Sequence, residues 1–83
     1  MQSTAADAIR QRMQIRRDLP TPTQRRALRL ASGLSQAEMA AAVGVTKQAV
    51  ANWEAGIRTP RGTHLERYVD ALRAVRDETA KVA

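Results

Sequence analysis

The segment from Ser35 to Gly56 constrains the fold of this chain most, because it specifies two short helices joined by a sharp turn. Ser35 and Glu38 form an S-x-x-E capping box, a signature of a helix start. Gly44 follows where that helix should end, since glycine enters the left-handed region without a Cβ clash. Thr46 is a suitable N-cap for a second helix, which Gly56 should end in the same way.

Residues within this segment recur at helical spacing. The buried stripe of the first helix is expected to contain Gln36, Met39, Ala40 and Val43. In the second helix, Val50 and Trp53 share one side. The opposite side carries Lys47, Gln48, Ala51, Asn52 and Ala55. The pattern therefore predicts a helix-turn-helix whose second helix exposes a polar face with no acidic residue except Glu54 near its edge.

The exposed face of the second helix has side chains suited to DNA. Lysine and glutamine in its first turn, with asparagine one turn later, can hydrogen-bond base edges in the major groove. The positive N-terminal end of the helix would also face phosphates. Any solvated helix can carry these residue types, so the preceding helix and turn are what favour DNA binding.

Residues 22–73 resemble the DNA-binding domain of the Cro and phage-repressor (XRE-like) helix-turn-helix family. Gln36 opens the motif, Ala40 is the small residue where its helices cross, and Gly44 is the turn glycine. The buried anchors of the recognition helix are Val50 and Trp53. The resemblance implies an all-α, lambda-repressor-like domain: a compact bundle of four to five short helices with the motif at its centre.

The resemblance also implies roles for single side chains. Base-reading positions of the recognition helix, residues 47–55, hold Lys47, Gln48, Ala51 and Asn52, with Ala51 able to touch a thymine methyl. Phosphate-contacting positions hold Gln36 and Thr46. Family members often pair an arginine of the first helix with a glutamate late in the recognition helix, and these positions hold Arg29 and Glu54.

Charge supports a polyanionic partner. The chain of 83 residues carries a net charge of +6 with a sequence pI near 11.3. Residues 1–26 contribute +4, whereas residues 65–83 are neutral. Arg58 and Arg61 lie in a loop directly after the recognition helix, so we expect them to contact phosphates rather than to be merely solvated.

Two further helices are expected before the motif. Residues Thr4 to Asp7 can cap a helix that runs to about Arg17, with Ala5, Ile9 and Met13 as its apolar side. Thr21 and Gln24 form a capping box with proline at the first helical position. That second helix should run to Ser32, stop at Gly33, and bury Leu28 and Ala31.

A last helix is expected after the motif. Thr63 and Glu66 form a capping box for it, and its apolar residues are Leu65, Tyr68, Val69, Leu72 and Val75. Residues 1–19 are thus assigned to a basic helix or arm, residues 20–76 to the DNA-binding domain with its motif at 35–56, and residues 77–83 to a helix extension or tail.

The two ends of the chain leave alternatives open. The N-terminal segment has four basic residues within eight positions: Arg10, Arg12, Arg16 and Arg17. It can pack on the domain, pair with a protein partner, or order on DNA. At the other end, a 3-4 spacing joins Leu65, Tyr68, Leu72, Val75, Thr79 and Val82. Either the helix completes the core and frays after Arg76, or it continues and forms a dimer that Val75→Asp would weaken.

These observations predict a cytoplasmic, nucleoid-associated transcriptional regulator of prokaryotic or phage origin, repressor-like, that binds a two-half-site operator as a homodimer. We expect no catalysis, cofactor, metal site or membrane span, because no catalytic triad, carboxylate pair, ligand cluster or long apolar run is present. His64 is expected at the surface. The alternatives are an antitoxin or co-regulator that uses the fold for protein contacts, or an architectural recombination accessory.

Overall fold

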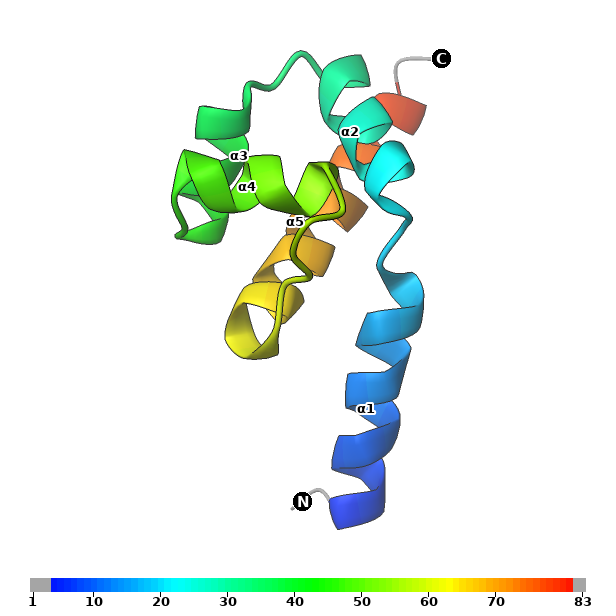
Figure 1. Ribbon diagram of the computed structural model, residues 1–83. Coiled ribbons are helices and arrows are strands. Elements are labelled where there is room, and N and C mark those ends of the chain that lie inside the picture. The colour runs from blue at the N-terminus through cyan, green and yellow to red at the C-terminus, as the bar shows by residue number, and fades with distance from the viewer. Residues whose placement is uncertain (1–3, 82–83) are drawn as a thin grey trace.

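The computed structural model describes residues 4–81, which form five helices and no strands (Figure 1). The helices are α1 (Ala5–Asp18), α2 (Pro22–Ala31), α3 (Gln36–Val43), α4 (Lys47–Glu54) and α5 (Gly62–Ala80). This confirms the predicted all-α class and the order of its elements. None of these helices is long and apolar enough to cross a membrane. Val82, which belongs to the predicted 3-4 spacing, lies outside the described residues.

Side-chain caps define most helix starts, as expected. Thr4, Thr21 and Ser35 each form a reciprocal capping box with the residue three positions later. Thr46 caps α4 by accepting a hydrogen bond from the backbone nitrogen of Ala49 at 3.1 Å. Gly44 ends α3 in the left-handed region with φ of 85°, which permits the sharp turn into α4.

The start of α5 differs from the prediction. The helix begins at Gly62 with Arg61 as its N-cap, and no side chain caps it. The expected box between Thr63 and Glu66 therefore does not form. The N-cap thus lies two residues earlier than predicted, at a turn where Gly62 has φ of 56°, and Thr63 is already inside the first helical turn.

The core lies where α3, α4 and α5 meet. Its buried cluster contains Met39, Ala40, Val43, Val50, Trp53, Tyr68, Leu72 and Val75. The rings of Trp53 and Tyr68 pack at a centroid distance of 4.7 Å. Among the described residues, the Tyr68 hydroxyl is a buried side-chain polar atom without a hydrogen-bond partner, and burial raises its pKa to about 12. Tyr68 therefore acts as a core aromatic.

Helix α2 buries arginines where the sequence predicted small apolar residues. Ala31 is exposed and Leu28 is only half-buried, so the predicted burial of Ala31 is wrong. Arg25 and Arg29 are instead buried, each about 7% exposed. Both point toward the end of α4, because hydrogen-bond acceptors there compensate the charge that an apolar core would not tolerate.

Helix α5 belongs to the core over most of its length. Leu65, Tyr68, Leu72 and Val75 are all buried within this chain, so their 3-4 spacing reflects intramolecular packing and is no evidence for a dimer surface. The expectation that Val75→Asp would act on a dimer is therefore corrected. The helix also continues beyond Arg76 to Ala80 rather than ending there.

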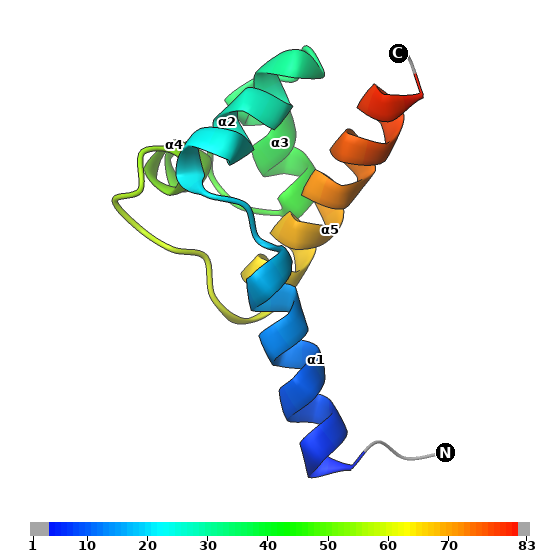
Figure 2. The ribbon, with the colours of Figure 1, turned by 90° about the vertical axis from the view of Figure 1, so that its right-hand side faces the viewer.

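Helix α1 projects from the rest of the molecule, as two perpendicular views show (Figures 1 and 2). Its last turn approaches α5, where Asp18 forms an ion pair with Arg73. No residue of Ala5–Asp18 is buried, and Ile9 and Met13 are 57% and 51% exposed. The apolar side predicted for this helix is thus present in sequence but is exposed within residues 4–81.

Candidate nucleic-acid interface

The solvent-facing side of α4 carries the four predicted base-reading residues. Lys47 and Gln48 are exposed, whereas Ala51 and Asn52 are half-buried. The side-chain nitrogen of Gln48 donates a hydrogen bond to Asn52 Oδ1 at 3.0 Å, which is an i,i+4 contact along the helix. The two amides therefore support each other, and the carbonyl oxygen of Gln48 remains available as an acceptor.

The N-terminal end of α4 offers further donors. The Thr46 hydroxyl oxygen accepts from Ala49 N, so its O–H can still donate to an outside group. Thr46 is exposed, as is Lys47 beside it. Because the first backbone N–H groups of a helix lack internal partners, this end combines a partial positive charge with a lysine and a hydroxyl.

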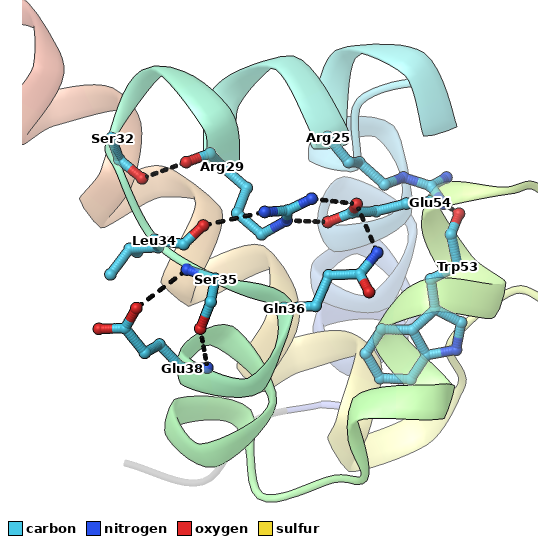
Figure 3. A network of polar contacts seen from close by, with 9 residues as sticks. All are labelled: Arg25, Arg29, Ser32, Leu34, Ser35, Gln36, Glu38, Trp53 and Glu54. Carbon is cyan, nitrogen blue, oxygen red and sulfur yellow. Dashed lines mark hydrogen bonds and ion pairs between the residues drawn. The ribbon is translucent and has the colours of Figure 1, made fainter.

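The opposite end of α4 is held by a buried ion pair (Figure 3). Arg29 Nε donates to Glu54 Oε2 at 2.6 Å, and Arg29 Nη2 donates to Glu54 Oε1 at 2.8 Å. The third guanidinium nitrogen donates to the Leu34 carbonyl at 2.9 Å. This bidentate contact ties α2 to the end of α4 and to the chain entering α3.

The contact favours the charged forms of both Glu54 and Arg29. Burial opposes the charge on Glu54, but hydrogen bonds from Arg29 and Gln36 outweigh it and lower the pKa of the carboxyl. The hydrogen bond to Glu54 raises the pKa of Arg29, although burial opposes its charge. Both groups are therefore charged near neutral pH, and their mutual contact compensates the charges inside the protein.

Gln36 takes part in the same network. Its side-chain nitrogen donates to Glu54 Oε1 at 3.2 Å, and the residue is half-buried (Figure 3). A primary amide has two N–H groups, so one remains for an outside acceptor. Gln36 borders a surface hollow together with Arg26 and Ala51. The structure thus places Gln36 next to the predicted base-reading residue Ala51, while its hydrogen bond to Glu54 limits its rotation.

Arg25 is a positioning residue that sequence reasoning missed. Its Nη1 donates to the Trp53 carbonyl at 3.0 Å, and its Nε donates to the Pro20 carbonyl at 2.7 Å. Burial lowers its pKa. A cation near the last carbonyls of a helix is favourable because those groups carry partial negative charge. One sequence signal could have indicated this role: Arg25 and Arg29 are four residues apart and therefore share the face of the helix that should be buried.

The loop after α4 folds back on that helix. The backbone nitrogens of Ile57 and Arg58 donate to the Asn52 carbonyl at 3.0 and 3.3 Å. Arg58 and Arg61 are exposed and border one open surface hollow with His64. The structure therefore brings the two predicted phosphate contacts together at the C-terminal end of the recognition helix, and places His64 at the surface as expected.

A metal centre has no support in residues 4–81. Within this range, no three His, Cys, Asp or Glu side chains are grouped so that they could hold an ion. Polar groups at the α4 surface are amides, a hydroxyl and cations, which suit recognition of bases and phosphates.

Comparison with known proteins agrees with this geometry. A helix-turn-helix family model (HTH_3) matches residues 26–77, which include α3, α4 and most of α2 and α5. No curated protein and no solved structure gives a significant match to the chain.

Proposed function

Because the chain belongs to the Cro and phage-repressor type of helix-turn-helix family, whose members bind DNA, we propose that it is a sequence-specific transcriptional regulator that reads the major groove with α4. One observation carries this proposal. The exposed face of α4 combines Lys47 with a hydrogen-bonded Gln48–Asn52 pair, while Glu54, the acidic residue of that helix, is buried in an ion pair.

In this proposal each polar group has a defined acceptor or donor on DNA. Lys47 donates to guanine O6 and N7, and Gln48 pairs with adenine N6 and N7 through its amide. Ala51 contacts a thymine methyl, and Asn52 both orients Gln48 and reaches the next base edge. Outside the bases, the phosphate contacts come from Gln36, Thr46, Arg58 and Arg61.

Rigid support of α4 would make this reading selective. Arg25 and Arg29 hold the last turn of α4 through Trp53 and Glu54, and Thr46 caps its first turn. A preorganised helix loses little conformational entropy on binding. Because a rigid helix cannot adjust to a wrong base, such a base leaves polar groups of the helix unpaired. Regulation would follow from occupancy of DNA: the bound protein would either block polymerase as a repressor or contact polymerase from an adjacent site.

One helix contacts few base pairs, so we propose a homodimer on two half-sites. In this motif class, half-sites lie about 34–36 Å apart, one turn of the duplex, so that both recognition helices enter the groove on the same face. The buried apolar side of α5 does not supply the dimer surface. The exposed Leu30 of α2 remains as a candidate for that surface.

To test this, the protein is used to select duplexes from genomic DNA, and its contacts on the selected site are mapped by footprinting. The affinity and base preference of a Gln48→Ala variant are then measured on the same site. That variant should lose about 1–3 kcal/mol on the selected site and relax the preference at one base position in each half-site. Gln11→Ala is the matched control, because Gln11 is an exposed glutamine of α1. Unchanged sequence preference in Gln48→Ala would reject α4 as the reading helix.

A second candidate is a protein-interaction module such as an antitoxin or co-regulator. The observation that favours it is the exposed Ile9 and Met13 of α1, since an unpartnered apolar pair can contact another protein. An Ile9→Gln/Met13→Gln variant separates the two functions. If the chain is a DNA-binding regulator, the variant should retain its DNA sequence preference. If the chain is a protein-interaction module, the variant should keep its fold but lose binding to its protein partner.

A further inference from the structure

Helix α1 carries four exposed arginines, which divide into two pairs by their place on the helix. Arg12 and Arg16 are one turn apart and share a side. Arg10 and Arg17 lie on another side, about 120° or more around the helix from Arg12. The half-buried Ile15, between Arg12 and Arg16 in sequence, borders the same hollow as Leu65 of α5. The two pairs therefore have different surroundings although they have equal charge.

The Arg12 and Arg16 pair lies near the end of the basic loop, which joins α4 to α5 and carries Arg58 and Arg61. Both border a small hollow with Gly62 of α5, and Gly62 directly follows Arg61, the N-cap of that helix. Figures 1 and 2 show the same arrangement: the end of the loop enters α5 beside α1. The loop that carries Arg58 and Arg61 therefore enters α5 next to the side of α1 that carries Arg12 and Arg16.

The charges of this pair are not neutralised by other described residues. Within residues 4–81, neither Arg12 nor Arg16 has a carboxylate within salt-bridge distance, although Glu66 borders the same hollow. Arg10, by contrast, forms an ion pair with Asp7 at 3.3 Å. Two unneutralised guanidinium groups near the loop that carries Arg58 and Arg61 match a polyanion that passes over both.

We propose that Arg12 and Arg16 bind the DNA phosphate backbone outside the base pairs read by α4, so that α1 is a second contact region on the same duplex. This inference rests on the proposed function of α4. A second copy of the chain is a poorer occupant, because it would bring like charges together. Phosphate contacts of this kind add affinity and salt dependence and carry no sequence information directly.

The test compares two double variants that remove the same charge from the same helix. Arg12→Gln/Arg16→Gln should lower the slope of log affinity against log salt by about two units, since each phosphate contact contributes roughly 0.9. Arg10→Gln/Arg17→Gln should change the slope by much less. In hydroxyl-radical footprints, the first variant should lose backbone protection beyond the half-site and keep protection within it.

Sequence preference separates this inference from the proposed function. Both variants should keep the preference of the unmodified chain, because α4 is unchanged. If the unmodified chain shows no preferred duplex, the proposed function fails. If it shows one but both variants lose equal slope, net charge alone explains the effect, and the assignment to Arg12 and Arg16 is overturned.

The apolar side of α1 provides a further arm of the test. Ile9→Gln/Met13→Gln retains every charge and should leave the salt slope and the footprint unchanged. A loss of DNA affinity found in this variant and absent from Arg12→Gln/Arg16→Gln would overturn the proposal and assign α1 to a protein contact. Circular dichroism of all variants would establish that the helices are retained.

Discussion

At the scale of single residues, the recognition helix is positioned by buried polar contacts together with apolar packing. Arg25 reaches the Trp53 carbonyl, and Arg29 and Gln36 reach the two oxygens of Glu54. A buried ion pair is weak evidence for added stability, because desolvation of both ions offsets their attraction. Its directional hydrogen bonds do define the distance and angle between α2 and the end of α4, on which the proposed base reading depends.

Removal of the Glu54 charge should expose this role. Glu54→Gln leaves the Arg29 guanidinium buried without a carboxylate, so we expect a loss of roughly 3–5 kcal/mol in the free energy of unfolding at neutral pH. Urea denaturation measures it, with Glu78→Gln as a control on an exposed carboxylate. A loss below about 1 kcal/mol would show that water or another group replaces the contact.

The same variant should alter the acid response. Since the folded-state pKa of Glu54 is lowered from its ordinary value of 4.5, its contribution is fully present above that value and is lost as the pH falls through the lower folded pKa. The stability difference between the parent chain and Glu54→Gln should therefore be constant above about pH 5 and shrink in more acidic solution. A constant difference down to pH 2 would contradict this.

At the scale of elements, α5 is a core helix and the preceding loop is an exposed basic segment. Leu72 and Val75 pack with Trp53 and Tyr68 in one cluster, so α5 belongs to the core as far as Val75. Arg58 and Arg61, by contrast, make no ion pair within residues 4–81. Substitutions in these two neighbouring elements should thus affect different properties.

Val75→Asp should unfold the domain or destabilise it by roughly 3–5 kcal/mol, because it places an uncompensated charge at a position that is 8% exposed. Thermal denaturation at several protein concentrations measures the effect. Ala74→Asp, one residue earlier and exposed, is the matched control and should change stability little. A Val75→Asp chain that kept its stability and lost only self-association would restore the dimer interpretation.

Arg58→Ala and Arg61→Ala should each weaken binding to all duplexes to a similar degree. Each lost phosphate contact should lower the salt slope by about one unit without a change in sequence preference. Lys81→Ala is the control, since Lys81 is an exposed cation that pairs with Glu78 at the far end of α5. An unchanged slope in both arginine variants would assign the loop to solvent.

At the scale of the whole molecule, the basic residues are concentrated on α1 and around the motif, while residues 65–83 are neutral overall. Under the proposed function, this asymmetry would orient α1 and the motif toward a duplex. The exposed apolar residues of the described chain are scattered over three elements, with Leu30 on α2, Ile57 in the loop, and Ile9 and Met13 on α1.

A dimer on DNA should depend on the distance between half-sites. A duplex with two half-sites about one helical turn apart should bind more tightly than a duplex with one. An insertion of half a turn, about five base pairs, places the second half-site on the opposite face and should abolish that gain. Mobility-shift and sedimentation measurements on these duplexes would decide it, and equal affinity for all of them would indicate a monomer.

Local sequence signals determined much of this fold. The capping residues Thr4, Thr21, Ser35 and Thr46 start their helices as predicted, and Gly44 makes the turn, because caps and left-handed glycines act within a few residues of the chain. Apolar spacing likewise identified Val50 and Trp53 as buried anchors. The Arg29–Glu54 contact was expected from family resemblance alone, and the structure contains it.

Only the tertiary structure decided which of two surfaces a side chain faces. A 3-4 spacing on α5 fits a dimer seam and a core equally, and the packing of α3 and α4 against α5 selected the core. The burial of Arg25 in place of Ala31 depends on acceptors at the end of α4, twenty-eight positions further along the chain. The proximity of Arg12 and Arg16 to the basic loop likewise follows from how α1 meets α5, because contacts between distant segments are set by packing geometry and are not encoded in local spacing.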